Sequence, residues 1–262
     1  NAPTDGSYFD RLGHSKLHAN GQVLKALGLL GGKLRFPCRL YEPFDTVEKL
    51  PGFLDSLRWE KCWPQSHHIW GGAFAFSRSA KCTDAWRECL FSWLDANVDP
   101  QSGWWKKGVP HADRHQGLGG AAHILPIYQH LDRPLPAPEK ILDSTLAMQL
   151  PSGRWLQTSD PNPMHYLELD ALYVFAFAGS ECPHYRRDDI LSSARRFGEA
   201  ARKFLTNHFD KILALHPHYI LAAIGCLGLL HQILPDEWRD DRPWTDIFSD
   251  PRFMRTSEVE IF

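Results

Sequence analysis

A short phrase of glycine, one further residue and an aromatic residue recurs along the chain, and it constrains the fold more than any other feature. Clear copies occupy residues 99–105 and 149–155, and residues 5–8 keep a remnant. Gly6, Gly103 and Gly153 are 97 and 50 residues apart, which indicates a period of about 50 with one degenerate copy near residues 54–63. Periods of this size are typical of repeat proteins, in which each unit buries its apolar face against its neighbours.

Two kinds of helical run alternate within this period. The first kind is rich in Ala, Gly and Leu and apolar on most sides, which predicts buried helices over residues 17–30, 67–79, 115–130, 165–178 and 218–230. The second kind is amphipathic and covers residues 46–57, 83–96, 138–149 and 187–207. Paired glycines in the buried runs, such as Gly71–Gly72 and Gly119–Gly120, indicate close approach of helices.

The alternation predicts an all-α fold. We expect one domain over residues 1–262, an α/α toroid of about five to six helical hairpins, each of about 50 residues. The more apolar character of the inner helices favours a closed toroid over an open superhelix. Residues 238–262 have no counterpart in the repeat and are expected to cap the barrel or to cross to a partner chain.

Composition excludes several classes of function. The formal net charge is −2 and Lys and Arg form no run, so we expect no nucleic-acid partner. The longest apolar stretch, residues 219–230, is too short to span a bilayer. The chain has no signal-peptide pattern and is expected to be soluble, in an unknown compartment and oligomeric state. None of the six cysteines forms a CxxC pair, which argues against a zinc knuckle.

Residues 149–155 read QxxxGxW, and residues 99–105 repeat the phrase with Asp in place of Gln. This phrase resembles the QW repeat of the terpenoid cyclase and protein prenyltransferase superfamily. The resemblance implies an α/α toroid, an architecture that polysaccharide lyases share. It implies no chemistry, because the DxDD and DDxxD motifs of the cyclases and the Asp-x-Cys zinc ligands of the prenyltransferases are absent here.

The histidines follow the same period. Each of five lies at or near the start of a predicted buried helix: His18, His68, His115, His165 and either His216 or His218. In a toroid those helix starts would gather around one mouth, where unpaired N–H groups favour an anionic ligand. The alternative is that each imidazole caps or packs its own helix.

Neighbouring residues suggest acid–base chemistry. Tyr166 and Tyr219 each follow a histidine of this series, and such pairs can supply a base and an acid. Glu168 and Asp170 lie in an apolar run, where they either bind a ligand or form a buried clamp to the next hairpin. His111 and His115 form an HxxxH pattern that could grip a divalent metal; no cofactor is otherwise expected.

These patterns predict an enzyme that acts on a uronate-containing saccharide, most simply a β-elimination lyase. The expected catalytic residues are His115, His165, Tyr166 and Tyr219. The expected substrate-binding residues are His18, His68, His111, His218, Glu168, Asp170, Trp70 and Trp105. A glycoside hydrolase is a variant of this hypothesis. The alternatives are a terpenoid cyclase or prenyltransferase-like enzyme that acts on an isoprenoid, and a non-catalytic helical-repeat binding module.

Overall fold

The computed structural model is all-helical over the residues that it describes, which are 16–32, 39–105, 108–215, 217–239, 241 and 244. Within these ranges the only extended pairing is an isolated bridge between Val98 and Trp105. The chain divides into two compact units. Unit 1 contains the described parts of residues 1–99 and 105–131, and unit 2 contains those of residues 100–104 and 132–254.

Unit 1 combines three long helices with one interrupted helical stretch. The long helices are α2 (Lys16–Leu29), α6 (Asp84–Ala96) and α7 (His115–His130). The interrupted stretch is α4 (Cys62–His68), the π-helical η3 (Ile69–Phe74) and α5 (Ala75–Ser77). Shorter elements are η1 (Arg39–Tyr41), α3 (Leu50–Ser56) and η2 (Trp59–Lys61). Helix α6 begins after Thr83, whose hydroxyl accepts the N–H of Trp86.

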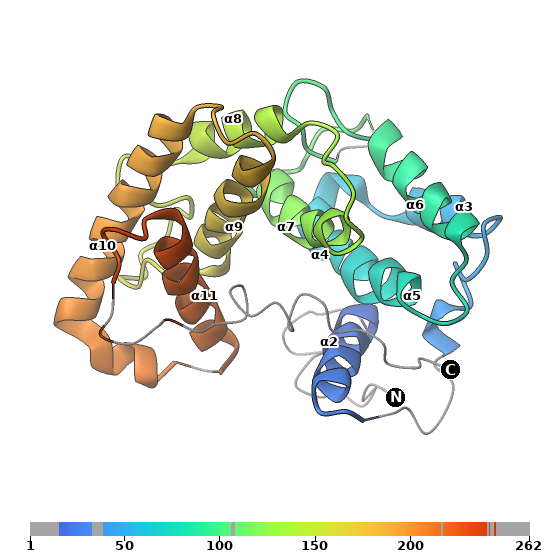
Figure 1. Ribbon diagram of the computed structural model, residues 1–262, viewed down its shortest axis with the longest axis horizontal. Coiled ribbons are helices and arrows are strands. Elements are labelled where there is room, and N and C mark those ends of the chain that lie inside the picture. The colour runs from blue at the N-terminus through green and yellow to red at the C-terminus, as the bar shows by residue number, and fades with distance from the viewer. Residues whose placement is uncertain are drawn as a thin grey trace. The chain divides into compact units, whose positions relative to one another are not determined.

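Glycines let the buried helices of unit 1 approach closely. Helix α2 packs on η3 and helix α4 packs on α7 (Figure 1). A Cβ atom on Gly21 would lie 2.6 Å from the Cα atom of Gly71, so neither helix tolerates a side chain at this contact. Gly120 of α7 faces the side chain of Cys62 of α4 in the same way. The interpretation of the paired glycines as points of close approach is confirmed.

Unit 2 is built around one buried helix. Helix α9 (Tyr166–Glu181) contacts α8 (Pro138–Met148), α10 (Arg187–Leu213) and α11 (Pro217–Ile233) (Figure 1). Every residue of α9 from Leu167 to Phe175 is buried. Helix α10 instead buries a single stripe, formed by Ile190, Ala194, Phe197, Ala201 and Phe204. The predicted contrast between buried and amphipathic helices is therefore confirmed for α9 and α10, whereas α11, predicted to be buried, leaves Leu221 and Ile224 exposed.

The QxxxGxW phrase joins the end of α8 to α10. The side-chain amide of Gln149 donates to the carbonyls of Gly153 and Ser193, at 2.9 Å in each case. Gly153 has φ +81°, and a Cβ atom there would lie 2.6 Å from the carbonyl oxygen of Arg196. Trp155 is fully buried and its indole donates to the carbonyl of Thr145 at 2.8 Å. All three residues that define the phrase are thus used in packing.

The second copy of the phrase adopts the same conformation at its glycine. Gly103 has φ +72°, and a Cβ atom there would lie 2.7 Å from the backbone nitrogen of Ile141 in α8. In both copies a left-handed glycine lets the turn lie directly against the backbone of an amphipathic helix. The repeat seen in the sequence is therefore also a repeat of backbone structure.

Three predicted boundaries differ from the structure, since α3 begins at Leu50 instead of residue 46 and α10 extends to Leu213 instead of residue 207, and one segment falls largely outside the described residues. The second buried helix begins at Cys62 instead of residue 67, because the polar residues 65–68 hid its first turns. This places His68 inside a continuous helical stretch and not at a helix start. Of residues 238–262, only 238, 239, 241 and 244 are described. Trp238 packs beneath Arg202 of α10, at 4.9 Å from the guanidinium carbon to the ring centroid.

Replacing Gly153 by Ala is expected to lower the free energy of unfolding by more than about 2 kcal/mol, because left-handed strain adds to a collision with α10. Gly108→Ala tests the strain alone, since φ is +71° there and nothing lies near the added methyl group. It should cost about 1 kcal/mol. Gly52→Ala, in open space within α3, should be neutral or stabilising by up to about 1 kcal/mol. Urea denaturation gives the three values, and equal losses for Gly153→Ala and Gly108→Ala would contradict the packing account.

Candidate functional site

A rigid loop leads from the QxxxGxW phrase to the start of α9, and Arg154 holds it. The guanidinium of Arg154 donates to the carbonyl of Asp160 at 2.9 Å and to that of Asn162 at 3.1 Å. Because these bonds cross the loop, they fix its far end relative to its beginning. The Arg154 side chain is mostly buried, which strengthens bonds of this kind.

Two consecutive side-chain turns complete the loop. The carboxylate of Asp160 accepts the N–H of Asn162 at 2.9 Å, and the amide oxygen of Asn162 accepts the N–H of Met164 at 3.0 Å. Pro161 and Pro163 alternate with these residues and fix φ at their own positions. The chain therefore reaches α9 in a single, preorganised conformation.

The loop brings Asp160 to His165, the residue before the first turn of α9. His165 has extended backbone geometry, with φ −109° and ψ 178°, and its Nε2 atom lies 3.3 Å from Oδ2 of Asp160. The His165 side chain is 17% exposed and that of Asp160 is 46% exposed, but the Nε2 atom itself is buried and forms no hydrogen bond with the carboxylate. The loop thus places a carboxylate beside one ring nitrogen of a histidine at the start of a buried helix. We call Asp160 and His165 the α9 site.

Glu168 lies directly beneath the α9 site and fastens the loop to the helix. Its Oε1 atom accepts the N–H groups of Trp155 and Leu156, at 3.1 and 2.8 Å, and lies 3.9 Å from Nε of Arg154. Burial raises the pKa of Glu168, against the opposing effect of the Leu156 N–H and Arg154. Glu168 is fully enclosed, so its position favours the buried clamp over the alternative role in binding substrate.

Asp170 is buried two residues further along α9. Burial raises its pKa well above the usual value, and the nearby Glu168 raises it further. The thiol of Cys226, on α11, has its pKa raised by the same burial and by both carboxyl groups. These groups therefore favour their neutral forms, and the hydrolase variant, which needs an accessible pair of carboxyl groups, finds no such pair in Glu168 and Asp170.

Unit 1 contains a related arrangement at the start of α7. The carboxylate of Asp113 accepts the N–H of His115 at 2.8 Å and the side-chain amide of Gln116 at 2.9 Å. Nδ1 of His115 lies 3.8 Å from Oδ1 of the same carboxylate. A histidine at the start of a buried helix, with an aspartate from the preceding loop, thus occurs in both units.

Three other imidazoles of unit 1 meet between its buried helices. The ring of His67 lies 4.2 Å from that of His18 and 4.5 Å from that of His123, between centroids. The Ser66 hydroxyl lies 2.8 Å from the carbonyl oxygen of Trp63 and 2.9 Å from Nδ1 of His123, with which it shares a hydrogen bond. We call this set the imidazole cluster.

The imidazole cluster differs from the predicted histidine register. His18 belongs to it, but its neighbour on α4 is His67 instead of His68, and its member on α7 is His123 instead of His115. His115 lies eight residues earlier on α7, about 12 Å along the axis. Sequence reasoning missed His67 and His123 because neighbouring helices pack with a shift relative to the repeat. Burial lowers the pKa of His68, which stands beside the cluster in sequence.

The remaining predicted residues fall into three groups. Tyr166 is half-buried and Tyr219 is 44% exposed, at the starts of α9 and α11; the side chain of His218 lies outside the described residues, as does all of His216. Trp70 is half-buried and stacks on Phe74. Trp105 is only 1% exposed and contacts Tyr128, so its position favours core packing over binding of a sugar face.

The geometry does not support a metal site formed by His111 and His115. His111 lies before the first turn of α7 and its Nε2 atom is 3.2 Å from the carbonyl oxygen of Trp105, so the two histidines do not share a helical face. Over the described ranges, no group of three or more His, Cys, Asp or Glu side chains has the arrangement of a metal site. Among the described helices, none has the length and apolar character needed to cross a membrane.

The stability of unit 2 should depend on pH through Asp170. A raised pKa means that the folded state holds the proton more tightly than the unfolded state. The stabilisation is therefore complete below the unfolded pKa and is lost as pH rises through the folded pKa. Asp170→Asn keeps the shape without ionising, so its stability relative to the parent should rise with pH, by up to about 1.4 kcal/mol per pH unit.

Urea denaturation of both proteins between about pH 4 and about pH 9 measures this difference. Asp188→Asn is the matched control, because Asp188 is exposed at the start of α10. A stability difference between Asp170→Asn and the parent that stays constant over the whole range would contradict the account.

Comparison of the chain with protein-family models, with curated proteins and with solved structures found no match. The geometry of the α9 site and of the imidazole cluster is therefore the basis on which function is argued.

Proposed function

We propose that this protein is an enzyme that cleaves a uronate-containing saccharide by β-elimination at the α9 site. The single observation that carries the proposal is the His165–Asp160 pair, with 3.3 Å between Nε2 and Oδ2, at the start of a buried helix. A histidine beside a carboxylate, with part of its side chain exposed, is a common arrangement for a general base.

The chemistry requires a base, an acid and neutralisation of the uronate carboxylate. His165, with its Nε2–H facing Asp160, takes the C5 proton of the uronate at Nδ1. The C5–H electron pair forms a double bond between C4 and C5, and the bond from C4 to the leaving oxygen breaks. The leaving oxygen takes a proton from an acid, for which Tyr166, the next residue in the chain, is the proposed group. The products are an unsaturated uronate and a free hydroxyl, with no oxidant or cofactor consumed.

The position of the pair at a helix start supports an acidic substrate. The N–H groups of the first turn of α9 and the positive end of its dipole favour a carboxylate near His165. Glu168 lies in the same turn, but burial raises its pKa and its Oε1 atom is occupied by backbone N–H groups, so it opposes this field less than an exposed carboxylate would.

We also propose the toroid as the architecture of the whole chain. Two observations support it: buried and amphipathic helices alternate within unit 2, and both copies of the glycine phrase share a left-handed glycine set against an amphipathic helix. The isoprenoid alternative draws only on that phrase. Since Gln149, Gly153 and Trp155 are used in packing, the phrase supports a fold and not a substrate.

The test is turnover of a panel of uronate oligosaccharides, followed by the ultraviolet absorbance of the unsaturated product. Parent protein should generate this absorbance. His165→Ala should lower the rate about 10²–10⁴-fold because it removes the base. Asp160→Asn, which retains hydrogen bonding but not charge, should lower it less. His115→Ala, in unit 1, tests whether the second histidine–aspartate arrangement takes part.

His184→Ala is the matched control, because His184 is exposed in unit 2 and away from the loop. Folding of each variant is checked by its unfolding midpoint. Binding of the oligosaccharides without any absorbance change would support the non-catalytic binding module. Absence of both binding and turnover across the panel would refute the proposal and transfer the search to isoprenoid diphosphates.

A further inference from the structure

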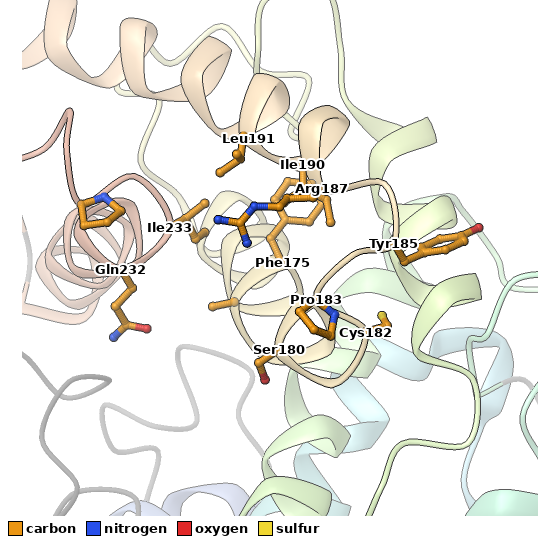
Figure 2. A pocket seen from close by; sticks show the side chains of 13 residues that line it. Phe175, Ser180, Cys182, Pro183, Tyr185, Arg187, Ile190, Leu191, Gln232 and Ile233 are labelled. Carbon is orange, nitrogen blue, oxygen red and sulfur yellow. The ribbon is translucent and has the colours of Figure 1, made fainter.

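A pocket lies at the opposite end of α9 from the α9 site. It has a volume of about 340 Å³ and is formed by the end of α9, the start of α10 and the end of α11 (Figure 2). Its lining on α9 begins at Phe175, ten residues after His165, so the pocket starts about 15 Å from His165 along the helix axis. We call it the end pocket.

The floor of the end pocket is apolar. Phe175 and Ile190 form its buried part, with 3% and 7% of their surfaces exposed. Further apolar side chains complete the walls: Leu191, Ile233, Pro183 and Pro235. A volume above about 300 Å³ and a mainly apolar lining with a few polar groups are typical of sites for small organic ligands.

One positive charge stands over this apolar floor. Figure 2 shows the Arg187 side chain reaching from the start of α10 across the pocket toward Ile233. Its neighbour Arg186 is held by Asp143 and Asp189, at 2.9 and 2.8 Å. Arg187, in contrast, makes no hydrogen bond or ion pair with any residue in the described part of the chain. Its guanidinium donors are therefore available to a ligand.

Nearby carboxylates either are engaged elsewhere or lie outside the lining of the pocket. Asp143 accepts the Tyr185 hydroxyl as well as Arg186, and Glu181 accepts the N–H of Leu135 at 2.8 Å. Asp188 follows Arg187 in the chain, and Glu139 acts electrostatically on Cys182 and Tyr185, but both carboxylates are exposed and neither lines the pocket. The charge that faces the pocket interior is thus that of Arg187.

The apolar floor and the single arginine indicate which class of ligand the end pocket would bind. A free sugar would find few polar partners on the floor, where Gln232 and Ser180 are the uncharged polar groups beside Cys182 and Tyr185. A polyphosphate would bring more negative charge than one guanidinium can balance. We propose that the end pocket binds a small organic monoanion, a carboxylate with an apolar body, whose carboxylate meets Arg187 and whose body covers Phe175 and Ile190.

The test is calorimetric titration of the full chain with octanoate, and with 1-octanol as the uncharged analogue. The parent should bind octanoate more tightly than octanol. Arg187→Gln should weaken octanoate binding by about tenfold or more and leave octanol binding nearly unchanged. Lys203→Gln removes the same charge from the exposed face of α10 outside the pocket and should change neither affinity.

A second variant tests the apolar floor independently of charge. Gly179 lines the pocket, and a Cβ atom there would meet nothing within 4 Å, so Gly179→Leu adds an apolar side chain that starts in open space beside the pocket. It should abolish binding of both ligands while the unfolding midpoint stays close to that of the parent. His165→Ala should leave octanoate binding intact, which separates this proposal from the proposed activity. No octanoate binding by the parent up to millimolar concentration, or equal binding by Arg187→Gln or Gly179→Leu, would overturn it.

Discussion

The α9 site depends on the hydrogen bonds that the carboxylate of Glu168 accepts. Two backbone N–H groups at the start of the loop, those of Trp155 and Leu156, donate to one of its oxygens, and Arg154 lies beside it. Arg154 in turn holds the carbonyls at the far end of the loop, next to His165. Removing the carboxylate would leave buried N–H groups without acceptors and would release the arginine, a cost of about 1–3 kcal/mol for each unsatisfied group.

The same region concentrates groups that burial keeps neutral. Asp170 and Cys226 both have their pKa values raised by burial and by neighbouring carboxyl groups, within a helix pair that is otherwise apolar. An apolar residue at either position would fit such a core at lower cost. Buried acids kept in a core despite that cost are most often found where function requires them, which agrees with a site at this end of α9.

The helices were predictable from sequence because their signals are local. The apolar pattern of residues 115–130 predicts the helix that α7 forms, whereas the left-handed conformation of Gly103 and Gly153 is seen only in the structure. The imidazole cluster was not predictable, because it depends on how far α7 is shifted along α4, which glycine contacts decide. The Asp160–His165 pair was missed although its signal was present: alternating Asp, Pro, Asn and Pro at residues 160–163 indicates two side-chain turns that shorten the path to His165.

The two ends of α9 differ in the groups that surround them, although both belong to the same helix. Its start has a histidine beside a carboxylate, a loop held by Arg154 and the positive end of the dipole, which are the features that the proposed proton transfer would use. Its end has an apolar floor, one arginine and the Cys182 thiol, whose pKa burial raises and whose Sγ–H already donates to the carbonyl of Ala178. No oriented acid or base faces that floor among the described lining residues, so the end pocket is fitted to bind a ligand without transforming it.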